Sequence, residues 1–314
     1  LSIFENSFMN YCKIKIFVQM EIKTQEISLP LLKEKEIKLF IKRTDQTHQH
    51  ISGNKWYKLK YNLIEAKKQG LETLLTFGGA YSNHIAATAC AAQEKSFKSI
   101  GIIRGEEHFP LNPTLQFAKD NRMLLRYVSR SDYREKTTPD FLEQLKVKFG
   151  DFYLIPEGGS NELAIQGTAE ILDANDTHDF VCCAVGTGGT IAGIINTSTD
   201  KQTVIGFPAI KGFYELKKDI ESWTKKKNWK LVNYYFCGGY AKVNKELIDF
   251  INSFYKEQQI PLDAVYTGKM MLGILDLITI DYFPKGSSIL AIHTGGLHGN
   301  KGMSKRLGVI LPIS

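Results

Sequence analysis

The sequence predicts a two-domain α/β fold built on parallel sheets. Three observations predict it. Short apolar runs alternate with helical stretches along the chain, which is the pattern of strands joined by crossover helices. The length of 314 residues suggests roughly two domains, and 43% hydrophobic residues is enough to form real cores.

The period of the apolar residues places each element. Alternating or continuous short apolar runs predict strands at 36–42, 73–76, 99–103, 123–128, 152–155, 180–185, 203–207 and 288–293. Helical spacing predicts helices at 54–69, 85–92, 113–119, 139–148, 162–174, 190–196, 211–225, 242–255 and 269–280. Gly70 is the expected stop of the first helix, Gly78-Gly79 an expected turn, and Ser82-Asn83 an expected helix cap.

The composition argues against two classes of partner. Lys and Arg total 40 against 33 Asp and Glu, and the net charge of +7 is mild, so it suits an anionic cofactor without requiring nucleic acid. The densest basic run, 225–227, is too short for a nucleic-acid interface. No apolar run reaches the length that spans a membrane, so we expect no membrane partner.

The cysteines and the start of the chain favour a cytoplasmic location. No two cysteines form a C-x-x-C pair, so we expect no metal site, and three of the five lie in apolar runs where they pack as small hydrophobes. Residues 1–19 lack the basic segment and the small-residue cleavage site of a secretory signal peptide. The expected natural start is Met9 or Met20. The cysteines are Cys12, Cys90, Cys182, Cys183 and Cys237.

A glycine-rich turn at 185–193 follows one apolar run and opens a helix. Such a turn presents free N–H groups and partial positive charge to an anion, and hydroxyls can add hydrogen bonds. The expected phosphate ligands are Gly186, Thr187, Gly188, Gly189 and Thr190. A dinucleotide is excluded because the sixth position of G-x-G-x-x-G is Ile191, and no Walker motif occurs in the chain.

A phosphate monoester that is not a nucleotide suggests pyridoxal phosphate. This cofactor needs a lysine for its Schiff base, a partner for the pyridine nitrogen and a phosphate cup. Lys55 follows a glycine turn and lies in the first turn of a helix, whose positive end favours the uncharged amine. On physical grounds alone Lys58 and Lys60 compete with it.

Five motifs in order carry a resemblance to one family. The chain from about residue 27 to its end resembles the 1-aminocyclopropane-1-carboxylate deaminase and D-cysteine desulfhydrase family of pyridoxal-phosphate enzymes. The resemblance implies fold type II, the fold of the tryptophan synthase β subunit, and a homodimer. The motifs lie at 52–59, 78–84, 157–161, 185–193 and 265–269.

The resemblance also implies roles for individual residues. Lys55 would carry the cofactor and move the α-proton, and Asn83 would hydrogen-bond the ring hydroxyl. Ser82 would lie near the substrate carboxylate. Tyr266 would pack by the ring and take part in proton transfer. Further implied contacts are Thr267 or Thr294 at the pyridine nitrogen, and Asn83, His84 and Tyr266 at the substrate.

The residue after the tyrosine separates the branches of this family. In the deaminase branch it is Glu, and here it is Thr267. A neutral hydroxyl at the pyridine nitrogen does not enforce its protonation as a carboxylate would, which favours β-elimination. His84 also matches the desulfhydrase branch. Ala86, Ala87 and the run 43–45 depart from the family pattern, so the substrate stays open.

These observations predict a small domain at 49–160 and a large domain made of 1–48 and 161–314, with the cofactor between them. The expected reaction is α,β-elimination on a small amino acid, D-cysteine by preference, to pyruvate, ammonia and sulfide. One alternative is 1-aminocyclopropane-1-carboxylate deamination; another is a cofactor-holding regulatory protein without turnover. Each of these residues, taken singly, also has an ordinary structural interpretation. Asn83 can be a helix cap, Tyr266 and His84 can be core residues, and Thr294 can be a turn residue.

Overall fold

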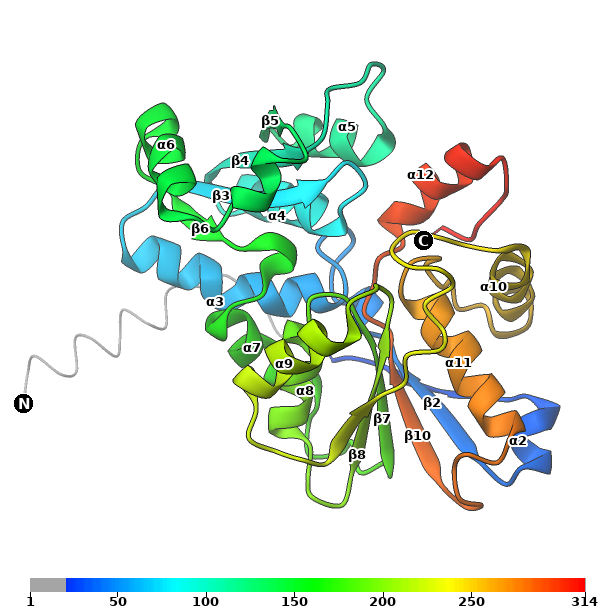
Figure 1. Ribbon diagram of the computed structural model, residues 1–314. Coiled ribbons are helices and arrows are strands. Elements are labelled where there is room, and N and C mark those ends of the chain that lie inside the picture. Colours follow the sequence, from blue (N-terminus) through cyan, green and yellow to red (C-terminus); the bar gives the residue numbers. More distant parts are fainter. Residues whose placement is uncertain (1–20, 314) are drawn as a thin grey trace, which may run out of the picture.

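Two sheets organise the chain in a computed structural model, which describes residues 21–313. The expected start at Met9 or Met20, the extension 1–19 and Cys12 lie outside the described residues. The larger sheet has the order β1-β2-β10-β7-β8-β9, and the smaller one the order β5-β4-β3-β6. All pairs are parallel except the edge pair β1 and β2. Figure 1 shows the smaller sheet above the larger one.

The bounds of the elements follow the apolar pattern closely. The strands are β1 Thr24–Ile27, β2 Lys38–Lys42, β3 Thr73–Gly79, β4 Lys98–Arg104, β5 Leu124–Val128, β6 Tyr153–Ile155, β7 Phe180–Val185, β8 Thr203–Pro208, β9 Trp229–Leu231 and β10 Ser288–Ile292. The α-helices are α2 Pro30–Glu34, α3 Asn54–Lys68, α4 Asn83–Glu94, α5 Pro113–Asp120, α6 Pro139–Phe149, α7 Glu162–Thr168, α8 Gly189–Thr197, α9 Phe213–Trp223, α10 Lys245–Gln258, α11 Thr267–Thr279 and α12 His298–Leu307. No helix among residues 21–313 is both long and apolar enough to cross a bilayer.

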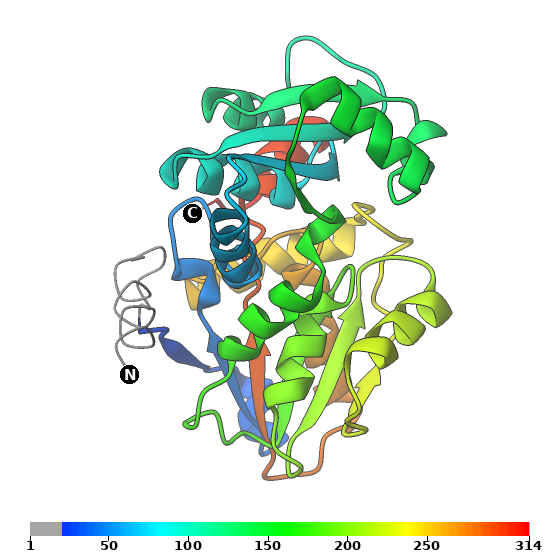
Figure 2. The same ribbon diagram turned by 90° about the vertical axis from the view of Figure 1, so that its left-hand side faces the viewer.

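Helices cover both faces of the larger sheet (Figures 1 and 2), so its central strand is buried on both sides. On β7, Cys182 and Ala184 pack into a core with α10 and α11, while Val181, Cys183 and Val185 pack into a second core with α8 and α9. Cys90, Cys182 and Cys183 are buried free thiols, which confirms that these cysteines pack as small hydrophobes.

The sequence pattern was wrong about two local features. Gly78 and Gly79 belong to β3 and not to a turn, because they pair with Ile103 and Arg104 of β4. The helix predicted to reach residue 174 ends at Thr168. The chain beyond it turns so that Asp173 and Asp176 can both accept hydrogen bonds from buried Lys42. Elements β1, α2, β9 and α12 were not predicted.

The carboxyl ends of β7 and β10 in one sheet and of β3, β4 and β6 in the other lead into one cavity. Helix α3 lies between the two sheets and packs against α7. Ligands of parallel α/β sheets bind outside the carboxyl ends of the strands. The strands of the smaller sheet fall within the predicted small domain, whose limits at 49 and 160 stay a prediction.

Candidate active site

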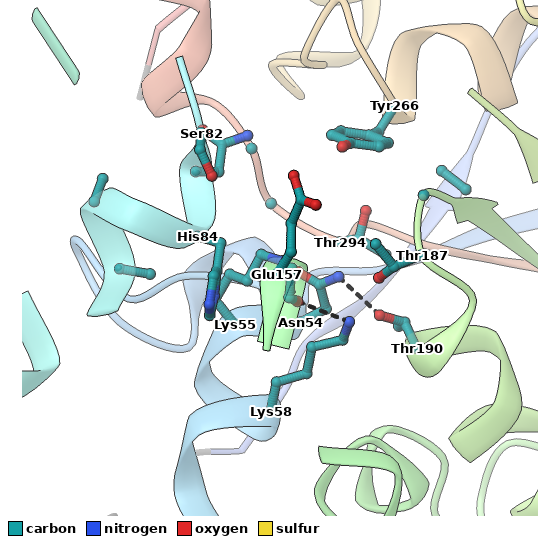
Figure 3. A pocket seen from close by; sticks show the side chains of 18 of the residues that line it. Asn54, Lys55, Lys58, Ser82, His84, Glu157, Thr187, Thr190, Tyr266 and Thr294 are labelled. Carbon is teal, nitrogen blue, oxygen red and sulfur yellow. Dashed lines mark hydrogen bonds between the residues drawn. The ribbon is translucent and has the colours of Figure 1, made fainter. Parts of the chain in front are cut away.

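The cavity has a volume of about 350 Å³, which suits a small-molecule ligand. It is lined by most of the residues predicted for the site. Those lining it are Lys55, Ser82, Asn83, His84, Gly186, Thr187, Gly188, Thr190, Tyr266 and Thr294. Gly189 and Thr267 are the predicted residues that do not line it. Figure 3 shows side chains from α3, α4 and the glycine-rich loop converging on this space.

Lys55 enters the cavity from the start of α3. The turn before it brings two backbones together: Gly53 has φ +64°, and a side chain there would lie 2.1 Å from the carbonyl oxygen of Thr294. The Lys55 Nζ donates a hydrogen bond to the carbonyl oxygen of Gly158 at 3.0 Å. Burial lowers the pKa of this amine to about 8, because a charged form loses its hydration there. Lys55 is therefore better suited than a surface lysine to attack a carbonyl near neutral pH.

The lowered pKa of Lys55 predicts how the rate of cofactor uptake depends on pH. The uncharged amine is the reactive form, so the rate at which the apoprotein couples pyridoxal phosphate should rise with pH and level off above about pH 8. Stopped-flow absorbance measures this rate. A rate that keeps rising toward pH 10.5, the ordinary value for lysine, would contradict the assignment.

The glycine-rich loop joins β7 to α8. Gly188 has φ +83° and precedes the first residue of α8, Gly189. A side chain at Gly189 would lie 2.8 Å from Ser160 Oγ and 3.4 Å from Lys58 Nζ, so only glycine leaves this space open. Thr187 hydrogen-bonds Ser160 at 2.6 Å. The loop is thus a backbone cradle beside a helix N-terminus, which is a suitable anion site.

Lys58, which sequence reasoning placed only as a competitor of Lys55, also lines the cavity. It lies one helical turn further along α3, is 2% exposed, and donates to Gly158 O at 3.0 Å and to Ser160 Oγ at 2.8 Å. Burial, with the charge of Lys55 nearby, holds its pKa well below the ordinary value. No carboxylate of the described residues forms an ion pair with Lys58. An anion bound at the glycine-rich loop would therefore supply the negative charge that pairs with the Lys58 ammonium group. Lys60, the other competitor, pairs with Glu170 and does not line the cavity.

The start of α4 forms the opposite wall of the cavity. Ser82 caps the helix by accepting a hydrogen bond from the Ile85 amide at 3.3 Å, as predicted. The Oδ1 atom of Asn83 is buried, and no residue of 21–313 provides it with a hydrogen bond. His84 Nε2 bonds Thr76 Oγ1 at 2.8 Å, and burial with two nearby lysine charges lowers its pKa well below the ordinary value. The imidazole is therefore neutral at neutral pH.

Tyr266 packs against the glycine-rich loop, and its ring would lie 3.2 Å from a side chain at Gly186. Burial raises its pKa well above the ordinary value, so its hydroxyl keeps its proton. The carboxylate of Asp263 accepts from the amides of Val265 and Tyr266 at 2.9 Å and of Thr267 at 2.7 Å. Asp263 fixes the start of α11; an acidic residue just before a helix is a signal that sequence reasoning missed.

The two threonines predicted for the pyridine nitrogen differ in position. Thr267 is fully buried outside the cavity lining, and its hydroxyl donates to Asp263 Oδ1 and accepts from the Asp263 amide, both at 2.8 Å. Thr294, directly after His293 at the end of β10, lines the cavity. The geometry therefore favours Thr294 as the hydroxyl that faces the ligand.

A known family model matches this arrangement. The model described as "Pyridoxal-phosphate dependent enzyme" matches residues 19–295. The chain belongs to the pyridoxal-phosphate dependent enzymes. A curated protein of Pyrococcus abyssi, named "Putative 1-aminocyclopropane-1-carboxylate deaminase", is 31% identical over 85% of this chain and 87% of its own length. The "Bifunctional D-cysteine desulfhydrase/1-aminocyclopropane-1-carboxylate deaminase, mitochondrial" of Arabidopsis thaliana is 31% identical over 83% of this chain and 73% of its own length.

The fold agrees with that family. A solved structure described as "Crystal Structure Analysis of the ACC deaminase homologue" superposes with a TM-score of 0.82 at 27% identity, covering 93% of this chain and 94% of that chain. The predicted α/β fold of type II and the predicted cofactor, pyridoxal phosphate, are confirmed.

The cavity itself suits the cofactor. The cradle at Gly189 with Lys58 can hold a phosphate, Lys55 can attach the aldehyde, and the unpaired buried oxygen of Asn83 can accept a hydrogen bond from a ring hydroxyl.

Proposed function

We propose that this enzyme catalyses α,β-elimination on a small amino acid, D-cysteine by preference, releasing pyruvate, ammonia and sulfide. The single observation that carries the proposal is a cavity lined together by a lysine of lowered pKa, the glycine-rich loop and Thr294. The Arabidopsis relative, whose name includes D-cysteine desulfhydrase, supports it.

Different residues of the chain have different roles in the proposed reaction. When bound, pyridoxal phosphate supplies the electron sink that stabilises negative charge at Cα. The free amine of Lys55 removes the α-proton, and its lowered pKa keeps a useful fraction uncharged. Ser82 and the first amides of α4 hold the substrate carboxylate at a positive helix end. Tyr266, whose hydroxyl keeps its proton, can donate that proton on the substrate side of the cavity.

The test is a panel of D- and L-amino acids with the purified holoenzyme, assayed for keto-acid release. We expect pyruvate and sulfide from D-cysteine. D-Cysteine that yields no more pyruvate than a protein-free blank would end the desulfhydrase proposal. The same panel shows which enantiomer the enzyme prefers, because L-cysteine and D-cysteine differ only in their configuration at Cα.

The second candidate is 1-aminocyclopropane-1-carboxylate deamination, which the names of several relatives favour. We rank elimination first because Thr294, a neutral hydroxyl, lines the cavity and the residue after the tyrosine is Thr267 rather than Glu. Release of 2-oxobutyrate from 1-aminocyclopropane-1-carboxylate, assayed beside the same panel and faster than pyruvate release from D-cysteine, would place deamination first. A spectrum that shifts with amino acids without any product would instead favour a binding or regulatory protein.

We further propose that the enzyme works as a cytoplasmic homodimer, with a small amino acid as its partner and neither nucleic acid nor a membrane. The mild net charge of +7 supports the absence of nucleic acid. Size-exclusion chromatography with light scattering measures the oligomer, and a monomer at micromolar concentration would contradict the dimer.

A further inference from the structure

The cavity contains a carboxylate that cofactor binding does not use. Among the described residues that line the cavity, Glu157 is the sole acidic one. It follows β6 and begins a short 3-10 helix, Glu157–Gly159, in which the Gly158 carbonyl oxygen accepts hydrogen bonds from Lys55 and Lys58 of α3. Figure 3 shows its side chain rising into the cavity, with the carboxylate between Ser82 on one side and Tyr266 on the other.

The surroundings of Glu157 hold its carboxylate in place without covering it. Lys136 Nζ lies 3.3 Å from Oε2, and the Glu157 side chain is still 35% exposed. Burial is the main cause of the raised pKa values of Tyr133, Tyr240 and Tyr266, and the charge of Glu157 raises all three further. The Glu157 side chain thus lines the cavity while Lys136 pairs with one of its carboxylate oxygens.

The position of this carboxylate matches one part of a bound amino acid. In the proposed function, Ser82 holds the substrate carboxylate and Tyr266 lies by the cofactor ring. In this orientation the substituent on Cβ would lie next to Glu157, whose carboxylate Figure 3 shows between Ser82 and Tyr266. An ionised carboxylate only accepts hydrogen bonds, so it favours a substituent with a hydrogen to donate and repels an anionic one.

We propose that Glu157 is a specificity-determining residue that selects amino acids whose β-substituent donates a hydrogen bond, such as a thiol, a hydroxyl or an ammonium group. This inference rests on the proposed function for the orientation of the substrate. A site built around such a bond rejects analogues that lack the donor, because its polar group is then left unpaired. The C–H groups of a cyclopropane ring offer no donor, so Glu157 also disfavours that substrate.

The test compares the binding of serine and alanine of the same chirality, because the two differ only in the β-hydroxyl. The rapid shift of the visible spectrum of the holoenzyme gives each Kd. We expect serine to bind roughly 10-fold or more tightly than alanine, the usual effect of a hydrogen bond to a charged group. The preference should shrink in Glu157→Gln, which keeps a neutral acceptor, and vanish in Glu157→Leu, which keeps none.

The matched control is Glu162→Gln, which makes the same charge change at an exposed position in the first turn of α7. Its serine preference should equal that of the wild type. An unchanged preference in Glu157→Leu, or an equal loss for both amino acids, would overturn the inference. Because this measurement needs binding and not turnover, a holoenzyme that prefers serine but releases no keto acid would contradict the proposed function alone.

Discussion

Replacing Lys55 with alanine should abolish covalent attachment of the cofactor and lower kcat for keto-acid release by about 10³-fold or more. Lys55 is the amine whose pKa desolvation lowers to about 8, and the substitution removes both the proposed covalent anchor and the proposed acceptor of the α-proton. After borohydride reduction of the wild type, peptide mass spectrometry should find the cofactor on Lys55. In Lys55→Ala no peptide should carry it.

The control for this experiment lies on the same helix. Lys68→Ala removes an exposed lysine, 69% accessible, from the last turn of α3, and it should leave the spectrum and kcat unchanged. Reduced cofactor on Lys58 in the Lys55→Ala variant, with activity retained, would show that the assignment of the two lysines is reversed. The Nζ atoms of Lys55 and Lys58 both donate to the carbonyl oxygen of Gly158, so the two amines lie close together and the experiment must identify the modified peptide to distinguish them.

The fold was predictable because parallel sheets leave a strong local signal. A strand buried on both faces must be apolar at consecutive positions, and β7 begins and ends at the predicted residues for that reason. The edge elements were not predictable in the same way. β9 has three residues, two of them half-buried, and it forms by pairing with β8, which local sequence does not encode.

The site was predictable where its function depends on local geometry. A glycine-rich strand-to-helix turn and a lysine at a helix start are visible as spacings, so Gly188 and Lys55 could be named. Contacts between distant segments were not. Nothing local to Thr267 shows that Asp263 satisfies its hydroxyl, and nothing local to Lys58 shows that it reaches Ser160, about a hundred positions away.

Replacing Lys58 with methionine should weaken the binding of pyridoxal phosphate on the order of 100-fold, the usual cost of removing one partner of a buried charge pair. Lys58 is 2% exposed, and its Nζ lies 3.4 Å from the space that glycine leaves open at position 189. Pyridoxal, which lacks the phosphate, should lose little affinity. Equilibrium titration of the apoprotein with each compound measures the two Kd values.

The same substitution separates charge pairing from structural damage. A buried lysine without a paired anion lowers the stability of the folded protein. The apo form of Lys58→Met should therefore unfold at a higher Tm than the apo wild type. Binding of the cofactor should raise the Tm of the variant by less than it raises the Tm of the wild type. Lys60→Met is the matched control, because Lys60 lies on the same helix but pairs with Glu170 away from the cavity, and its Kd for pyridoxal phosphate should not change. Equal losses of affinity for pyridoxal and pyridoxal phosphate in Lys58→Met would mean that Lys58 shapes the cavity without meeting the phosphate. The difference between the two compounds therefore measures the contact between Lys58 and the phosphate.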